Sequence, residues 1–294
     1  MIIRETSFFS NGYNLKAKLF LPDDYKEGEK RPCVIPNSGY IGLLDIYPSL
    51  FARALTKKGY VAFGFNYRGF SDSEGPAGVC KLEEQVEDIK NAITFVKTLG
   101  VIDEDRIGLL GWGMAAGLIA KVTAEDKRVK AMAGLNGFYN GERWLRSVYS
   151  YADFINMRNE IEEEKVRFVK EGTRKFDNPF HFYPMDTSTT KVVKDNLYPV
   201  KDYGQDISLE IGQSILEFNA EKYVNDIQVP VFIGHGKDNL LHPIGESKLF
   251  FEKITSKKEF YTIDGKHNDF MFDDHPVLAG LVTKLDSFFS QMQM

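Results

Sequence analysis

Short, nearly continuous apolar runs alternate with amphipathic stretches over most of the chain, and this alternation constrains the fold more than any other feature. Strands this apolar are usually covered on both faces, as in parallel sheets. The pattern therefore predicts an α/β fold with a mostly parallel, doubly wound sheet. The expected strands lie at 33–35, 61–65, 107–110, 129–133, 231–233 and 259–263, and the expected helices lie near 46–58, 82–99, 114–124, 244–255 and 277–291.

The N-terminal segment has a different pattern, in which apolar and polar residues alternate with a period of two. This alternation in residues 13–21, together with residues 2–9, predicts an antiparallel hairpin. Asn11-Gly12 lies between the two runs and is the expected turn, because both residues tolerate a positive φ.

Residues 136–220 interrupt the β-α order. Residues 141–172 are predicted to be helical, whereas 173–206 are rich in Asp, Pro, Thr and Tyr and are expected to be looped. We interpret 136–220 as a helical cap over the carboxyl edge of the sheet, inserted between core segments 1–135 and 221–294. The alternative is a structural domain unrelated to any pocket.

The charges exclude several classes of partner. The formal net charge is −5, from 37 basic and 42 acidic residues that are interspersed along the chain. No Lys/Arg-rich block is present, so neither nucleic acid nor an anionic membrane is expected to bind. No apolar run reaches the ~18 residues of a membrane span.

The cellular setting is predicted from the N-terminus and the cysteines. The first residues carry no secretory-signal pattern, and Cys33 and Cys80 do not make a disulfide framework. These features favour a reduced, cytoplasmic location and a small-molecule ligand.

Residues 106–117 run from an apolar strand through a small-residue turn into a helix, which is the setting of the nucleophile elbow G-x-S-x-G. Gly111 and Ala115 supply the small neighbours that this tight turn requires. The central residue is Gly113, which has neither a hydroxyl nor a thiol, so covalent acyl transfer of the usual kind cannot start there. Glycine also tolerates the positive φ of this position without strain.

Two later segments supply the acid and the histidine that accompany such an elbow in a catalytic triad. Residues 231–243 form an apolar strand that ends in Gly-His-Gly-x-Asp, with the acid at Asp238. His267 follows another strand and precedes the last helix. The order elbow, acid, histidine is the order of the triad residues in α/β hydrolases.

Together these motifs resemble the dienelactone hydrolase-like and S15-peptidase-like branch of the α/β-hydrolase superfamily. Residues 60–75, which include Asn-Tyr-Arg-Gly-Phe-Ser-Asp-Ser-Glu-Gly, are similar to a strand and loop of that branch, as are 87–89, 101–103 and 126–131. The likeness covers nearly the whole chain outside 136–220, and it implies an α/β-hydrolase fold.

The resemblance also implies roles for individual residues. His267 would be the general base and Asp238 the acid that orients it, with Gly113 at the vacant nucleophile position. An oxyanion hole would be made by the backbone N–H of Met114 and by the loop of Gly39 and Tyr40.

We expect the residues that line the substrate pocket to come from the oxyanion loop, the elbow and the cap. The candidates are Ser38, Trp112, Tyr139, Arg143, Trp144 and Tyr149. Packing of the cap against the core is the alternative role of the last four. His235 is expected to end its strand and support the following loop.

Substitute nucleophiles and cofactors are not favoured by the sequence. The substitutes considered are Ser38 in the oxyanion loop, Cys33 within an apolar strand, where burial is expected, and Cys80 in a loop after Val79. No His, Cys, Asp and Glu cluster has the spacing of a metal site, so neither metal nor cofactor is expected.

Three functional hypotheses follow. The first is a noncovalent enzyme of carbonyl compounds, which hydrolyses an ester, thioester or lactone directly or else performs C–C cleavage, decarboxylation or cyclisation. The second is a catalytically inactive homologue that binds a ligand or a protein. The third is a variant of an acyl hydrolase in which the nucleophile was replaced by Gly113. The fold is compatible with a homodimer, although the sequence presents no recognisable interface.

Overall fold

The computed structural model describes residues 1–39, 41–273 and 275–293. One eight-stranded sheet runs through it in the order β1-β2-β4-β3-β5-β6-β9-β10. Only β1 and β2 at one edge run antiparallel to their neighbours, whereas the other pairs are parallel. The strands are β1 (Ile2–Ser10), β2 (Tyr13–Leu21), β3 (Arg31–Asn37), β4 (Val61–Phe65), β5 (Ile102–Trp112), β6 (Val129–Leu135), β9 (Val231–Gly236) and β10 (Lys258–Ile263).

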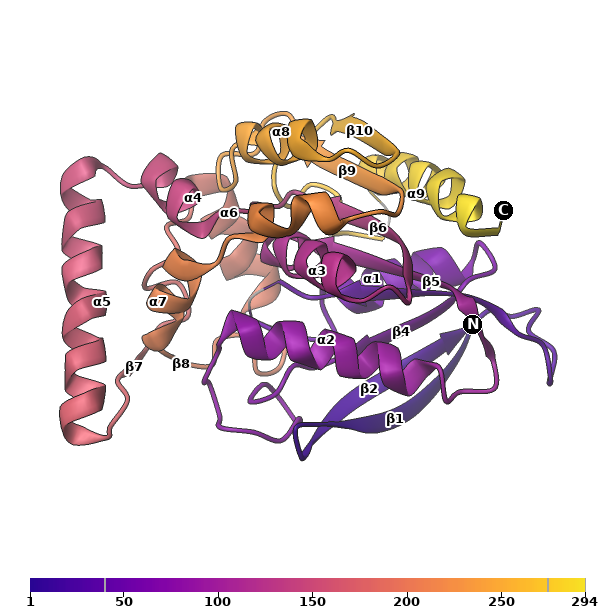
Figure 1. Ribbon diagram of the computed structural model, residues 1–294, viewed down its shortest axis with the longest axis horizontal. Coiled ribbons are helices and arrows are strands. Elements are labelled where there is room, and N and C mark those ends of the chain that lie inside the picture. Colours follow the sequence, from indigo (N-terminus) through magenta and orange to yellow (C-terminus); the bar gives the residue numbers. More distant parts are fainter. Residues whose placement is uncertain (40, 274, 294) are drawn as a thin grey trace.

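Helices cover both faces of this sheet, as its apolar strands require (Figure 1). Helices α1 (Tyr47–Thr56) and α9 (Pro276–Phe289) pack into one hydrophobic cluster with residues such as Val34 and Phe232. Helices α2 (Leu82–Val96), α3 (Met114–Glu125) and α8 (Ile244–Lys253) contribute to the cluster on the other face. The doubly wound α/β-hydrolase fold predicted from the sequence is confirmed.

The N-terminal hairpin turns where the sequence predicts it. Asn11 has φ 48° and Gly12 has φ 87°, so both central residues lie in the left-handed region of a two-residue turn. Such a turn matches the twist of the strands it joins. It sets the register in which Ser10 pairs with Tyr13.

The insertion at 136–220 lies beside the carboxyl ends of the parallel strands, with α5 standing at the outer edge of the molecule (Figure 1). It is helical over 141–171, as predicted, and mostly irregular afterwards. Its elements are α4 (Gly141–Val148), α5 (Tyr151–Glu171), β7 (Phe176–Asp177), α6 (Thr187–Val192), a π-helical turn η1 (Val193–Leu197), β8 (Ile207–Ser208) and α7 (Glu210–Glu217). The 3₁₀ segment η2 (Ala220–Asp226) leads back into the core, and a second one, η3 (Ser290–Gln293), follows α9.

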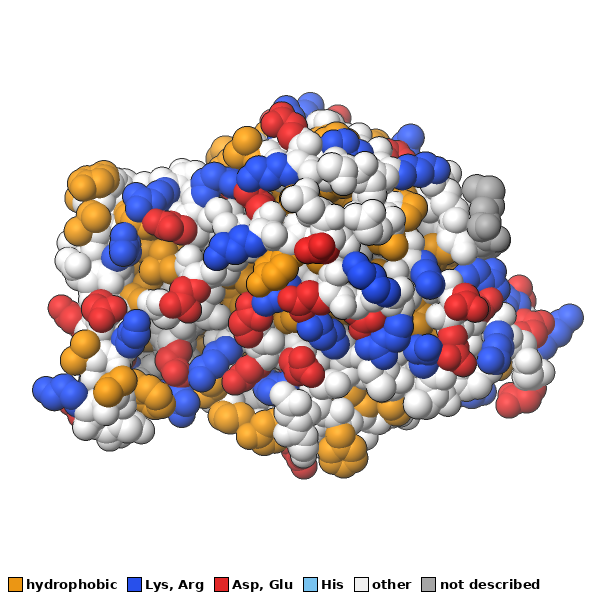
Figure 2. All heavy atoms as spheres, viewed as in Figure 1, with side chains coloured by type: hydrophobic (Ala, Val, Ile, Leu, Met, Phe, Trp, Pro, Cys, Tyr) orange, Lys and Arg blue, Asp and Glu red, His pale blue; other side chains and the backbone are white. Residues whose placement is uncertain are grey.

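The surface has the mixed charge that the composition predicts. Figure 2 shows Lys and Arg side chains interspersed with Asp and Glu over the visible face, so neither positive nor negative charge dominates a large area there. None of the helices in the described residues is both long enough and apolar enough to cross a membrane.

Candidate functional site

The turn between β5 and α3 keeps the geometry of a nucleophile elbow although its central residue is glycine. Gly113 has φ 61° and ψ −128°, and α3 begins at the next residue. A Cβ placed on Gly111 would lie 2.5 Å from the carbonyl oxygen of Ala115, so the turn requires glycine there. Among the described residues, a Cβ placed on Gly113 would have a single neighbour within 4 Å, the Cε1 atom of His242 at 3.7 Å. The position therefore has room for a side chain that the sequence does not supply.

Gly113 opens into a pocket between the core and the insertion. The pocket holds about 530 Å³ of empty space, counting the space at its mouth. The core contributes Ser38, Gly39, Ile41, Ile46, Tyr47, Trp112, Gly113, Met114, Leu241, His267 and Asn268 to its lining, and the insertion contributes Phe180, Tyr183, Met185, Thr189, Val193, Leu197 and Tyr203. Among these described residues there is no Asp, Glu, Lys or Arg, so the lining is apolar with a few neutral polar groups.

Two residues with candidate oxyanion donors, Met114 and Gly39, line the same pocket. Met114 is the first residue of α3, and the first N–H groups of a helix have no partner within the helix. Gly39 lies against Trp112, in the loop after β3. Two of the three predicted oxyanion residues, Gly39 and Met114, therefore line the pocket, where a backbone N–H can donate a hydrogen bond to a carbonyl oxygen. Tyr40, the third predicted oxyanion residue, lies outside the described residues.

His267 lines the pocket as predicted, but its ring is held by packing rather than by a carboxylate. The ring centroid lies 4.4 Å from that of Trp112 and 4.7 Å from that of His242. Its Nδ1 atom is buried and has no hydrogen-bond partner among the described residues. Burial lowers the pKa of His267 well below its usual value of 6.5, so the ring is neutral at pH 7.

The structure does not bring Asp238 to His267, and the expected His–Asp pair is absent. The Asp238 side chain is exposed, and its backbone N–H donates to the carbonyl oxygen of Gly265. This turn directs the next residue, Asn239, inward instead, where its Oδ1 accepts from the backbone N–H of His242. An amide is buried here more cheaply than an unpaired carboxylate, which explains the outward orientation of Asp238.

His242, which the sequence did not single out, is the imidazole nearest to the vacant position. It is fully buried. Its Nδ1 lies 2.6 Å from the backbone oxygen of Asn136, and its Nε2 lies 2.5 Å from the Tyr183 hydroxyl. Burial lowers the pKa of His242 to about 3, so it is also neutral at pH 7. The contacts that hold His242 involve residues 59 and 106 positions away in the sequence, so no local pattern predicts its position.

Asn136 connects the two histidines. It follows β6 with φ 49°, a left-handed conformation that asparagine tolerates better than most residues. Its Nδ2 donates to the backbone oxygen of His267 at 2.8 Å, and its Oδ1 accepts from the backbone N–H of Gly236 at 2.7 Å. Its own carbonyl oxygen accepts from His242. A single buried residue thus positions both rings.

We expect Asn136→Ala to lower the free energy of unfolding by about 2–4 kcal/mol, because two buried backbone groups lose their partners. Asn136→Gly removes the same side-chain bonds but accepts the positive φ, so it should be less destabilising by about 1 kcal/mol. Chemical denaturation of the two variants separates the hydrogen bonds from the backbone strain. Wild-type unfolding midpoints for both would contradict this role of Asn136.

Four predicted pocket residues do not line the pocket, and their expected substrate-binding role is corrected. Tyr139 is fully buried and stacks on Phe250, with ring centroids 3.8 Å apart. Arg143 forms ion pairs with two buried carboxylates of the core, Glu221 at 2.6 Å and Glu246 at 2.8 Å. These contacts attach the insertion to the core.

Trp144 and Tyr149 have the same kind of packing role. Trp144 is fully buried, and its Nε1 donates to the carbonyl oxygen of Leu241 at 2.9 Å. Tyr149 is half-buried against the hydrophobic core. By contrast, Ser38 and Trp112 line the pocket as predicted. The sequence predicts that aromatic residues of the insertion line the pocket, but Trp144 and Tyr149 pack against the core instead, because this buries their large apolar area.

The remaining candidates supply no substitute nucleophile. Cys33 and Cys80 are buried away from the pocket, and burial raises the pKa of both thiols. His235 ends β9 and supports the following loop, as expected, through its Nε2 contact of 2.8 Å with the His242 carbonyl oxygen. Within the described residues, no group of three or more His, Cys, Asp and Glu could hold a metal ion.

Comparison with known proteins assigns the family. Residues 28–275 match the family described as serine aminopeptidase, S33. The chain belongs to this family of α/β hydrolases. The S33 match places it in the superfamily that the sequence motifs predict.

Individual members are only distantly similar to this S33-family chain. An uncharacterized 31.7 kDa protein of Escherichia coli is 27% identical over 254 residues, which cover 82% of this chain and 84% of that protein. The crystal structure of hypothetical protein PA2218 of Pseudomonas aeruginosa has a TM-score of 0.81 at 19% identity, over 98% of this chain and 94% of that one. The α/β hydrolase GrgF of a Penicillium species has a TM-score of 0.82 at 17% identity, over 99% of each chain. These two structures are similar in fold.

Proposed function

We propose that this protein binds a neutral, carbonyl-containing small molecule in the pocket at Gly113 and acts on it by noncovalent acid–base chemistry. The supporting observation is the arrangement around the vacant position. The Gly39 and Met114 N–H groups line one apolar pocket together with the neutral imidazole of His267. Donors fixed in an apolar pocket stabilise a developing oxyanion more strongly than water does.

A water molecule or a larger substrate can occupy the space that a nucleophile would fill. The neutral ring of His267 can then accept a proton from that water or from the substrate. Without Asp238 beside it, the resulting imidazolium has no anionic partner among residues 1–39, 41–273 and 275–293. In serine proteases, loss of the equivalent carboxylate function lowers kcat by about 10⁴-fold. Activated acyl compounds and reactions through an enolate are therefore favoured over the hydrolysis of ordinary esters or peptides.

Aminopeptidase activity fits this pocket poorly, despite the name of the family. A peptide N-terminus carries an ammonium group, whose burial requires a carboxylate or several acceptors. The described residues that line the pocket include no Asp or Glu. A neutral ligand is the better match, and the ester, thioester, lactone and enolate reactions all remain within this proposal.

The insertion at 136–220 is, in this proposal, the cap of the site. It supplies seven lining residues, among them Phe180, Met185 and Leu197, which close the side of the pocket opposite the elbow. An apolar cap excludes water, and this strengthens the electrostatic interactions beneath it.

Ligand binding without turnover is a second candidate function, favoured by the contacts around His267. The buried Nδ1 of His267 has no hydrogen-bond partner within the part of the chain that the structure describes, and Asp238 is exposed. Both features fit a protein that has kept the pocket and the N–H donors but no longer stabilises a charged histidine.

Hydrolysis of a panel of activated nitrophenyl esters separates these candidates. We expect slow turnover by the wild-type protein that His267→Ala abolishes. Binding of the esters without turnover would support the second candidate and contradict the first. Ordinary unactivated esters serve as the matched negative substrates.

Gly113→Ser tests the vacant position itself. The side chain has room, but a residue with a Cβ at φ 61° is strained by about 1–3 kcal/mol, so we expect a lower unfolding midpoint. Mass spectrometry should detect a covalent acyl-enzyme with activated esters in this variant and not in the wild type. An acyl adduct on the wild-type protein would contradict the noncovalent mechanism.

A further inference from the structure

Helix α5 stands at the outer edge of the molecule, where little of its surface is covered (Figure 1). It contacts α4 and α7, and its buried side chains are Phe154, Met157 and Ile161. Three buried residues in a helix of 21 residues leave most of its circumference exposed to solvent. A surface helix usually buries a wider apolar face than this.

One exposed side of α5 carries a row of residues that we call the α5 stripe. Its members are spaced three or four residues apart, so they lie along one side of an α-helix. Tyr151 and Val169 end the row and are 79% and 80% exposed, and Val166 is 48% exposed. Exposed apolar residues gathered in this way often mark an interaction surface. The α5 stripe consists of Tyr151, Ile155, Arg158, Glu162, Val166 and Val169.

A groove between α5 and α7 lies beside the α5 stripe. Ile155 of α5 and Leu216 of α7, both half-buried against the core, are part of its lining. Arg158 and Glu162 of the stripe also line it. Helices pack on one another by placing a ridge of side chains into such a groove. The molecule therefore presents a ridge and a groove for a further helix.

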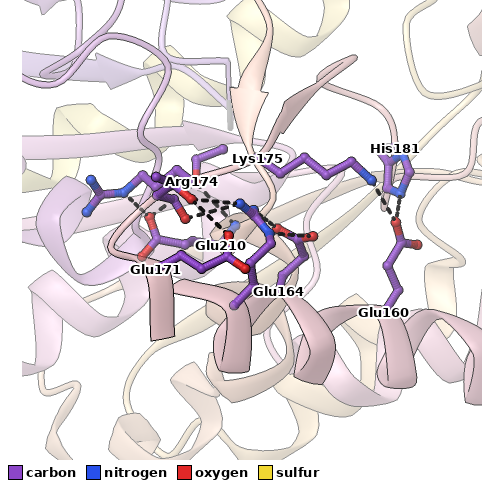
Figure 3. A network of polar contacts seen from close by, with 10 residues as sticks. Glu160, Glu164, Glu171, Arg174, Lys175, His181 and Glu210 are labelled. Atoms are coloured by element: carbon purple, nitrogen blue, oxygen red, sulfur yellow. Dashed lines mark hydrogen bonds and ion pairs between the residues drawn. The ribbon is translucent and has the colours of Figure 1, made fainter. Parts of the chain in front are cut away.

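The charged residues on the opposite side of α5 have partners within the same chain. Figure 3 shows Glu160 reaching both His181 and Lys175, at distances of 2.8 Å and 3.9 Å. Glu164 pairs with Arg167, which lies one turn further along the helix. These ion pairs leave no role for a second protein on that side.

The charges of the α5 stripe are not paired in this way. Arg158 makes no hydrogen bond or ion pair with another described residue. Glu162 lies 3.9 Å from Lys165, and both of these side chains are more than half exposed. One positive and one negative charge are thus available for a partner, between the apolar ends of the stripe.

The order of residues in the α5 stripe is self-complementary about residue 160. Tyr151 and Val169 are each nine residues from that position, and Arg158 and Glu162 are each two residues from it. When two such helices pack antiparallel about a two-fold axis at residue 160, Tyr151 lies opposite the partner's Val169. Arg158 then lies opposite the partner's Glu162. Apolar residues meet apolar ones, and opposite charges meet, at each of these contacts.

We propose that two copies of this protein associate through their α5 stripes, with the two helices antiparallel. Each Arg158 pairs with the partner's Glu162, and each Tyr151 packs on the partner's Val169. A contact about a two-fold axis uses the same surface of both subunits and closes as a dimer. The interface joins the insertions of the two molecules, so this proposal does not depend on the reaction at Gly113.

The size of the contact sets the strength of the dimer. The α5 stripe extends over about 27 Å from Tyr151 to Val169, because an α-helix rises about 1.5 Å per residue. One pair of helices in contact over this length buries less than the roughly 1,600 Å² of a standard protein interface. We therefore expect a reversible dimer that dissociates on dilution.

Sedimentation velocity at protein concentrations from about 1 to 100 µM measures this association. We expect the wild-type protein to shift from monomer toward dimer as the concentration rises, at low ionic strength where charges are little screened. Arg158→Glu and Glu162→Arg should each raise the dissociation constant of the dimer by about 10-fold or more, because each brings like charges together at two symmetric contacts. Both variants should fold normally, since the two side chains are exposed.

An equimolar mixture of these two single variants tests the contact itself. Positions 158 and 162 are both acidic in one variant and both basic in the other, so opposite charges meet at both contacts of a mixed dimer. We expect the mixture to dimerise more strongly than either variant alone. Lys222→Glu is the matched control, because it reverses an exposed basic charge on η2, which packs on α3 and α8. It should retain the wild-type association.

Three results would overturn the proposal. The first is a wild-type protein that stays monomeric throughout this concentration range. The second is a dimer that survives both single variants, because another surface must then hold it. The third is a mixture that dimerises no better than its components, since the charge at position 158 would then not face position 162 of the partner.

Discussion

Lowering the pH from 6.5 to 5 is expected to remove several kcal/mol from the free energy of unfolding. His235, His242 and His267 are buried and neutral in the folded protein, and burial lowers the pKa of His235 to about 4 and that of His242 to about 3. In the unfolded chain each histidine binds a proton as the pH falls below about 6.5. The folded state does not, so it loses stability relative to the unfolded state.

The direction and the size of this pH effect on the free energy of unfolding follow from the number of protons that each state binds. The unfolded state binds up to three more protons than the folded state below pH 6.5, so stability falls with decreasing pH by at most about 4 kcal/mol per unit. The loss begins at the unfolded pKa and continues until each folded pKa is reached. Because a domain is typically stable by only about 5–15 kcal/mol, unfolding should occur at mildly acidic pH.

The surroundings of the three rings contain no described carboxylate that would stabilise their charged forms. His235 contacts the Ser247 hydroxyl and Asn239, and His267 packs on Trp112. His242 contacts Tyr183, Asn136 and the ring of His267. Each ring would therefore be protonated without a compensating negative charge.

Urea unfolding at several pH values between 5 and 6.5 measures this dependence. His235→Gln removes one of the three groups, so the slope should fall by about 1.4 kcal/mol per pH unit even if the variant is less stable throughout. A wild-type slope below about 1.4 kcal/mol per pH unit, which corresponds to one proton, would show that the buried rings titrate normally. This result would contradict the neutral states proposed for the three histidines.

Trp144→Ala is expected to lower the free energy of unfolding by about 3–5 kcal/mol, the range measured for large aromatic residues in well-packed cores. The Trp144 side chain is fully buried and stacks on Phe138, with ring centroids 4.4 Å apart. The change also leaves the carbonyl oxygen of Leu241 without its indole donor. Trp144 lies between the insertion and the core, so its loss weakens the attachment of both Tyr183 and Leu241.

The matched control is Trp144→Phe, which keeps an aromatic ring but loses the indole N–H. Its expected cost is smaller, about 1–3 kcal/mol, because the main change is an unsatisfied carbonyl and a partial cavity. Thermal and urea unfolding measure both variants. A loss below about 1 kcal/mol for Trp144→Ala would mean that the insertion unfolds independently of the core.

The fold was largely determined by local patterns in the sequence. Apolar runs and helical periods predicted the sheet and its helices, because burial on both faces of a parallel sheet leaves a pattern that short windows reveal. Asn11-Gly12 predicted the first turn, since its backbone conformation is a property of those two residues. The strand–turn–helix segment with Gly113 at its centre was also predictable, because it is contiguous in the sequence.

The arrangement of the site was decided by tertiary structure. Asp238 and His267 stand in the expected order along the chain, yet the turn after β9 directs the carboxylate outward and Asn239 inward. The Tyr183–His242–Asn136 chain joins residues that are 59 and 106 positions apart. Such contacts depend on how the insertion packs on the core and on which polar groups burial can satisfy, and neither is a property of any short segment. The sequence alone therefore determined the fold and the glycine at the centre of the elbow, whereas packing determined which polar groups surround Gly113.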